Sequence, residues 1–194
     1  MLLKQAGDYI LTKLRKELPA HFTYHNIDHV QDVYQAAKQL GKKEQITPAE
    51  MDLLLTAACY HDAGFLKGPA GHEAESCRIS RETLPGFGYT TSEIEQVCSL
   101  IAATRLPQAP KNHLEQILAD ADLDYLGRDD FFEISDKLYR ELKLAGGISD
   151  METWDKAQVA FIEQHHYFTQ TAINTRQPQK EVNLAQIKAR LKST

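Results

Sequence analysis

Apolar residues recur along this chain at the three- and four-residue spacing of an α-helix. Ile27, Val30, Val33, Ala37 and Leu40, for example, fall on one face of a predicted helix. No segment shows the period-two alternation with β-branched residues that is typical of strands. The pattern therefore predicts an all-α protein, with helices over residues 2–18, 27–40, 48–60, 72–84, 91–101, 113–121, 131–144, 149–173 and 180–192.

One predicted helix is apolar on nearly every side. It carries the run from Leu53 to Cys59, and a helix of this kind belongs at the centre of a domain. Its start is marked by Thr47-Pro48-Ala49-Glu50, a capping box with proline in the first turn. Asn26 is suited to cap another helix, and Pro178 marks a joint between the last two predicted helices.

The composition is that of an ordinary soluble protein. With 194 residues, 42% of them hydrophobic and 25% charged, the chain suits one domain with a sizeable core. The net charge of −5 argues against broad, non-specific nucleic-acid binding, but small phosphorylated ligands need only local positive charge. Three scattered cysteines, no signal-peptide pattern and no membrane-length apolar run make the cytoplasm the expected compartment.

Polar residues stand at the ends of two predicted buried helices. His61 and Asp62 follow the central helix directly, where a polar pair is costly unless it is paired or binds a ligand. Neighbouring residues point about 100° apart on a helix, so both can face one ion only at a terminal turn. Asp120 and Asp122 close another apolar helix. A mixed shell of imidazole and carboxylate suits Mn, Fe, Co, Ni or Zn, and carboxylate oxygen also suits Mg.

Two further histidines, His25 and His29, precede this pair and share one helix face if the first turn includes both. The ordered set of His, then His-Asp, then Asp resembles the signature of the HD-domain superfamily of metal-dependent phosphohydrolases. The resemblance covers residues 23–130. It implies one helical-bundle domain of the HD/phosphodiesterase type over residues 1–194, with the metal-site core at 23–130 and accessory helices at 131–194.

By position, this resemblance implies that the metal ligands are His29, His61, Asp62 and Asp122. Asp122 is preferred because the last aspartate of the family stands between alanine and a hydrophobic residue or arginine, as Asp122 does. Asp120 is the runner-up for the same position.

The string from Tyr24 to His29 also resembles the opening motif of cyclic-nucleotide phosphodiesterases. In those enzymes the first histidine of the motif protonates the leaving oxygen, and an imidazole with a pKa near about 6.5 can do so at neutral pH. The resemblance therefore implies that His25 is catalytic and not a ligand. Asp62 would be the second catalytic residue, because it would orient the water as well as bind the metal.

Some HD-domain proteins hold a second metal with further histidines after the His-Asp pair. His72 could serve here, but the later position that often holds histidine beside threonine reads Ala103-Thr104-Arg105. A complete second set of protein ligands is therefore not predicted, although Asp62 could bridge to a second ion. His72, Arg105 and Arg140 are the candidates for substrate binding.

The sequence thus predicts a metal-dependent phosphohydrolase that cleaves a phosphate monoester or phosphodiester of a nucleotide-like small molecule. A metal-activated water would attack, and His25 would be the general acid. Ala63-Gly64-Phe65 lacks the acidic residue that certain nucleotidases and alarmone hydrolases carry, which disfavours their substrates. A non-catalytic nucleotide sensor, a di-iron oxygenase on the same fold and a structural adaptor stay open as alternatives.

The expected partner is a phosphorylated small molecule, with neither a nucleic-acid polymer nor a membrane. The C-terminal helices could also form a homodimer. The sequence does not name the substrate, the native metal or the number of ions, because geometry and availability choose among similar ions.

Overall fold

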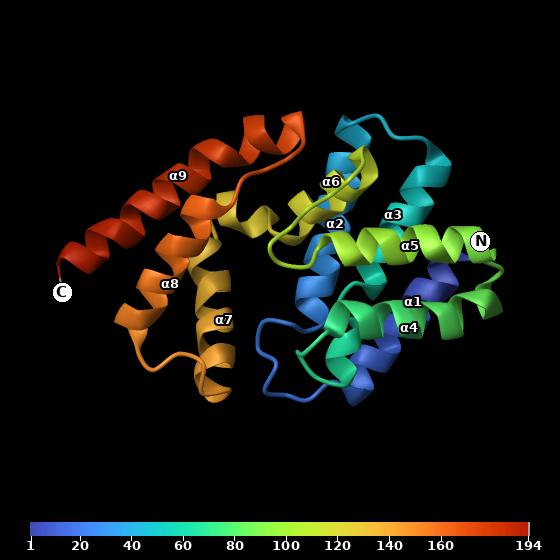
Figure 1. Cartoon of the computed structure of the whole chain (residues 1–194), viewed down its shortest axis with the longest axis horizontal. Coiled ribbons are helices and arrows are strands. Elements are labelled where there is room, and N and C mark those ends of the chain that lie inside the picture. Colours follow the sequence, from blue (N-terminus) through green and yellow to red (C-terminus); the bar gives the residue numbers. More distant parts are fainter. Residues whose placement is uncertain (194) are drawn as a thin grey trace. The chain divides into compact units, whose positions relative to one another are not determined.

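The computed structural model describes residues 1–193, and over that range it consists of α-helices and short 3-10 helices without a strand (Figure 1). The predicted all-α class is confirmed. The chain forms two compact units: the first contains residues 1–19 and 25–122, and the second contains residues 20–24 and the chain from Leu123 onward. None of the described helices could span a lipid bilayer.

The first unit is built around α3 (Pro48–Tyr60). The Thr47 hydroxyl accepts from the Glu50 amide, and the Glu50 carboxylate accepts from the Thr47 amide, so the predicted capping box is present. Its residues from Leu53 to Tyr60 are all buried, which confirms the prediction of a central helix. The helices packed against it are α1 (Leu3–Glu17), α2 (Ile27–Lys43), α4 (His72–Thr83), α5 (Thr91–Ala103) and α6 (His113–Asp122).

Two short 3-10 helices complete the first unit, η1 (Ala63–Leu66) and η2 (Leu84–Phe87). Helix α4 packs against η1 and runs beside α5 (Figure 1). The N-terminus of α2 is capped by Asn26, whose side chain accepts hydrogen bonds from the amides of Asp28 and His29. Because α2, α4 and α6 all pack against α3, the starts of α2 and α4 and the ends of α3 and α6 belong to one compact unit.

The second unit contains η3 (Asp124–Gly127), α7 (Phe131–Leu144), α8 (Met151–Gln164) and α9 (Gln170–Lys192). Its core is formed by aromatic and aliphatic side chains: Tyr24, Leu123, Tyr125, Leu126, Phe131, Ile162 and Ile187.

Two predicted helix boundaries in the second unit are wrong. The helix expected to reach Ile173 ends at Gln164, and α9 passes through Pro178 instead of stopping there. The backbone is extended at Thr169, whose hydroxyl accepts from the Ala172 amide at 3.2 Å and caps the new helix. Proline removes one internal hydrogen bond, and burial of Ile187 and its neighbours in the core holds the helix on its course.

The segment between α8 and α9 is fastened by a buried lysine. Lys180 Nζ donates to the His165 carbonyl oxygen at 2.6 Å and to His165 Nδ1 at 3.2 Å, and it lies 5.4 Å from the Tyr167 ring centroid. Burial, together with the charge of Lys180, lowers the pKa of His165 to about 3. Nε2 of His165 is buried without a hydrogen-bond partner among the described residues.

We expect this histidine to make the protein less stable in acid. Between pH 6.5 and about 3, His165 is protonated in the unfolded chain but neutral in the folded one. The contribution of His165 to the free energy of unfolding is therefore complete above pH 6.5 and is lost as the pH falls. One proton corresponds to about 1.4 kcal/mol of unfolding free energy per pH unit. In His165→Asn, which keeps an acceptor near Nδ1, denaturant unfolding at pH 4–7 should show a shallower pH slope. Equal slopes in both proteins would contradict this account.

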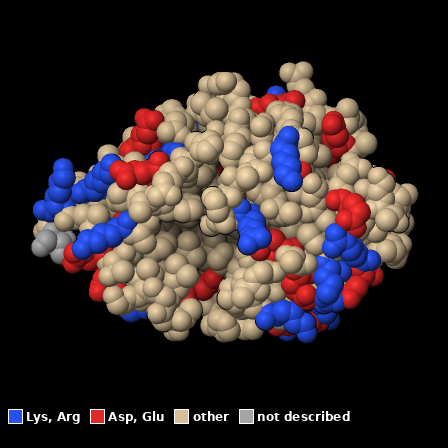
Figure 2. Space-filling view, viewed as in Figure 1, with Lys and Arg blue, Asp and Glu red and all other residues tan. Residues whose placement is uncertain are grey.

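Charged side chains are distributed over the surface. On the face seen in Figure 2, basic and acidic residues are interspersed, and neither gathers into a large patch of one sign. This agrees with the modest net charge of −5.

Candidate metal centre

The predicted His-Asp pair occupies the turn that ends the buried helix. His61 follows the last residue of α3, and Asp62 is the residue before η1. A single buried hydroxyl fixes this turn against α4: Ser76 Oγ donates to the His61 carbonyl oxygen at 2.6 Å and accepts from the Gly64 amide at 2.8 Å. The turn is therefore held by side-chain contacts and does not depend on regular helix geometry.

Gly64 allows the close approach of this turn to α4. A Cβ atom at Gly64 would lie 2.0 Å from the His72 carbonyl oxygen and 2.8 Å from its Cα, and backbone atoms cannot move aside as a flexible side chain can. We expect Gly64→Ala to destabilise the fold by about 1–3 kcal/mol or more, as overpacking does, and to weaken metal binding. At Gly86 a Cβ would meet nothing within 4 Å, so Gly86→Ala is the matched control. Thermal unfolding and metal titration of both variants test this, and equal effects would contradict it.

Two more predicted ligands come from α2 and α6. His29 lies in the first turn of α2, directly after its cap, and Asp122 is the last residue of α6. These helices pack against each other and against α3. The packing brings the start of one helix and the ends of two others together.

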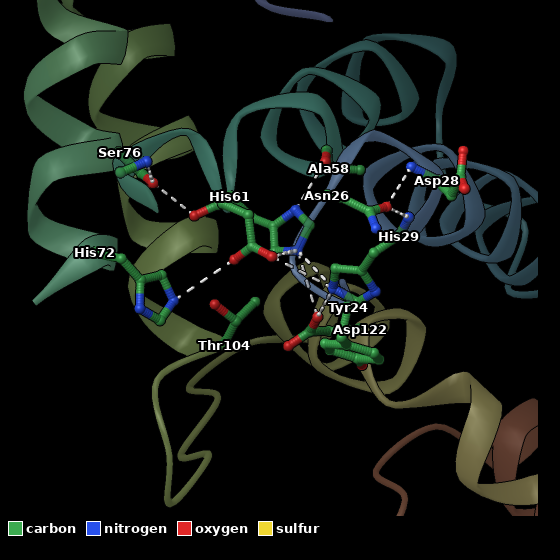
Figure 3. A network of polar contacts seen from close by, with 12 residues as sticks. Tyr24, Asn26, Asp28, His29, Ala58, His61, His72, Ser76, Thr104 and Asp122 are labelled. Carbon is green, nitrogen blue, oxygen red and sulfur yellow. Dashed lines mark hydrogen bonds and ion pairs between the residues drawn. The ribbon is translucent and has the colours of Figure 1, made fainter. Parts of the chain in front are cut away.

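The side chains of His29, His61 and Asp122 point toward one another (Figure 3), and an Asp62 oxygen lies close to both histidines. His29 Nε2 lies 3.3 Å from His61 Nε2, 3.4 Å from Asp62 Oδ2 and 3.3 Å from Asp122 Oδ1. His61 Nε2 lies 3.4 Å from each of the same two carboxylate oxygens. Atoms that share a cation at roughly 2.0–2.3 Å lie about 3 Å from one another. The predicted ligand set is thus assembled with the spacing of a metal site.

The convergent atoms are nitrogens and oxygens whose lone pairs can bind a cation. His61 Nδ1 faces the Ala58 carbonyl oxygen at 2.9 Å, so the proton of the neutral ring belongs there and Nε2 presents a lone pair. Asp62 Oδ2 is buried and has no hydrogen-bond partner among the described residues. Burying such acceptors together is costly unless a cation lies among them. The donor set, two imidazoles and two carboxylates, therefore fits a divalent first-row metal.

The charges at this point are strongly coupled. Burial opposes ionisation of Asp62, but the adjacent His61 outweighs it and holds the pKa of Asp62 far below its usual value. The same balance with His29 and His61 lowers the pKa of Asp122 to about 2. Burial also opposes protonation of His61, and the two carboxylates overcome it and raise the pKa of His61 well above 6.5. A proton and a metal ion would compete for this site.

The second oxygen of Asp62 faces another group. Asp62 Oδ1 lies 3.5 Å from His72 Nε2, which is 3.7 Å from Glu73 Oε1. His72 Nδ1 lies 3.1 Å from the Pro69 carbonyl oxygen, which orients the ring at the start of α4. The two oxygens of one carboxylate thus face two separate sets of metal-binding groups.

His25 lies beside the convergent ligands but outside α2. Asn26 is the helix cap, as predicted, so the first helical turn does not include His25, and the condition for His25 and His29 to share a helix face is not met. The two ring centroids are nevertheless 6.0 Å apart. The His25 ring is stacked on Phe65, with centroids 4.2 Å apart and planes 14° from parallel.

The remaining predicted site residues are placed differently. Asp120 is fully buried but is not among the ligand atoms that lie within 4.8 Å of one another, which come from His29, His61 and Asp122. Arg105 is exposed after the end of α5. Arg140 belongs to the second unit, where it is exposed and pairs with Asp136 at 2.5 Å. Substrate binding by either arginine stays a prediction.

Sequence reasoning missed two residues around this centre, Ser76 and Phe65. Ser76 stands in the middle of a predicted helix, and nothing in its neighbours marks it as the residue that ties the His-Asp turn. The one sequence signal for Phe65 is that a large aromatic residue stands three positions after Asp62.

Comparison with known proteins gives one family and several similar folds. The HD-CE family model matches residues 19–167. A predicted HD superfamily hydrolase from an uncultured Thermotogales bacterium has a TM-score of 0.64 at 18% identity, over 96% of this chain and 91% of that one. No curated protein matches the chain.

Two other solved structures share the fold over the whole chain. A protein of Lactobacillus plantarum has a TM-score of 0.69 at 20% identity, over 100% of both chains. Bacillus subtilis YpgQ in complex with ADP has a TM-score of 0.67 at 20% identity, over 100% of this chain and 97% of that one. The family match covers most of the chain and agrees with the ordered histidines and aspartates, and this chain therefore belongs to the HD-CE family of HD-domain proteins.

Proposed function

We propose that this protein is a metal-dependent phosphohydrolase acting on a phosphate ester of a nucleotide-like small molecule. The observation that carries the proposal is the convergence of His29, His61, Asp62 and Asp122, in which Asp62 Oδ2 is buried without a hydrogen-bond partner among the described residues. Support also comes from the structural neighbour described as a predicted HD superfamily hydrolase, and from YpgQ, whose structure contains ADP.

The four convergent residues would hold a divalent ion. Such an ion lowers the pKa of a bound water and polarises a phosphoryl oxygen. Two buried carboxylates would otherwise repel an anionic phosphate, so positive charge at this point is a condition for substrate binding. Asp62, whose Oδ2 lies near His29, would help to hold the ion, and its Oδ1, which lies 3.5 Å from His72 Nε2, would orient the attacking water.

His25 would protonate the leaving oxygen. It stands one residue before the cap of α2, outside the set of convergent atoms but close to His29. A histidine titrates near neutral pH and can hold a proton until the ester bond breaks. Asp62 and His25 would thus share the work, with the carboxylate directing the water and the imidazole assisting departure of the alcohol.

The test is release of phosphate or nucleoside from a panel of nucleotides, cyclic nucleotides and dinucleotides with added Mn²⁺. Turnover of one class by the wild type, absent in Asp62→Ala, is the expected result and names the substrate type. An inert wild-type protein that still retains its metal would overturn the proposal and favour a sensor or an oxygenase.

A further inference from the structure

One buried aromatic ring contacts both histidines that lie next to the convergent ligands. Phe65 is 3% exposed and belongs to η1, three residues after Asp62. Its ring centroid is 4.2 Å from that of His25 and 4.4 Å from that of His72, and the two imidazole centroids are 6.4 Å apart. The Phe65 ring therefore contacts two imidazoles, one from the segment before α2 and one from the start of α4.

The contacts with the two histidines differ in kind. His25 is nearly parallel to the phenyl ring, at 14°, which is the geometry of a stacked pair. His72 is tilted by 38° and is oriented by its own contact with the Pro69 carbonyl oxygen. His72 thus limits movement of the phenyl ring from one side, while the phenyl ring limits the orientation of His25.

His25 needs such support because of its place in the chain. It precedes the helix cap Asn26 and so lies outside α2. A general acid must lie within hydrogen-bond reach of the oxygen that it protonates, and small misplacements are costly. The stack with a buried ring is a means of holding the imidazole plane.

We propose that Phe65 is a positioning residue, which holds the His25 imidazole in the plane from which it protonates the leaving group. This rests on the proposed function. The chain order supports it, because Phe65 follows the ligand Asp62 within a single 3-10 turn. The same short segment therefore sets the place of a ligand and the orientation of the acid.

The experiment compares Phe65→Leu, which keeps an apolar side chain but removes the flat ring, with Phe65→Tyr, which keeps the ring. We expect Phe65→Leu to retain its metal and its fold while kcat falls about 10- to 100-fold, as for a weakened general acid. Phe65→Tyr should restore most of the rate. Phe87→Leu is the matched control, since Phe87 belongs to η2 and its ring centroid lies 5.6 Å from that of Tyr9.

Two readouts separate positioning from simple packing. The loss in Phe65→Leu should be larger for an alkyl or nucleoside ester than for a p-nitrophenyl ester, whose leaving group departs without protonation. In a His25→Ala background, Phe65→Leu should cost no further activity, because the residue acts through His25.

The possible failures are distinguishable. If the wild type hydrolyses no phosphate ester, the proposed function fails. If the wild type is active and Phe65→Leu has the same kcat, the positioning role of Phe65 is wrong while the proposed function stands. The same conclusion follows if the fold losses of kcat in Phe65→Leu and His25→Ala multiply in the double variant.

Discussion

Replacing His61 or Asp62 by alanine is expected to remove both the bound metal and turnover. Each variant deletes one of the four convergent side chains. His61 is also only 1% exposed, so bulk water does not reach its position to replace the imidazole as a ligand. Loss of an outer partner of a metal ligand already lowers affinity roughly 10- to 100-fold, and loss of a ligand itself should exceed that. Turnover should fall to background.

Metal content after desalting, measured by atomic emission, and phosphate release are the two readouts. Asp62→Asn serves as a nearly isosteric variant, in which the fold is kept while one charge is removed. His113→Ala is the control, since this histidine is half exposed and lies 3.3 Å from Glu44. Full metal and full activity in both alanine variants would remove the assignment of the centre.

Replacing His25 by alanine is expected to leave the metal in place but to slow turnover on the order of a hundredfold or more, which is the range for a lost general acid. The two effects separate because the His25 ring centroid is 6.0 Å from that of His29 and its nitrogens are not among the convergent atoms. Steady-state kcat at saturating Mn²⁺, measured beside metal content, checks both parts of this expectation. An unchanged rate would show that another group protonates the leaving oxygen.

Sequence patterns predicted those parts of the fold that depend on local chemistry. The capping box at Thr47 and Glu50 and the cap at Asn26 form as expected, because each uses side chains within three residues of the backbone groups they satisfy. The apolar run after Pro48 is buried on all sides for a similar reason. The four ligands were predicted from the family resemblance, and in the structure the helices bring those four side chains together.

The errors arise where distant packing decides. A joint was expected near Pro178, between a helix ending at Ile173 and another beginning at Lys180, but the core of the second unit keeps α9 continuous. Asn26 caps α2 as predicted, so His25 lies outside the first turn that it would need to share with His29. Phe65 contacts His25, which lies 40 positions earlier in the chain, and His72, which begins α4. No spacing in the sequence indicates these contacts.

The buried cluster of His29, His61, Asp62 and Asp122 has a consequence for the amount of protein as well as for its activity. An ion that binds the folded chain alone stabilises it by RT ln(1 + [L]/Kd), which is about 2.7 kcal/mol at a hundredfold excess over Kd. Without the ion, Asp62 Oδ2 stays buried beside a second carboxylate and unbalanced. Proteases act on the unfolded fraction, which grows several-fold for each kcal/mol lost. A cell starved of the metal would therefore degrade this protein, and abundance would report metal supply before any assay of turnover did.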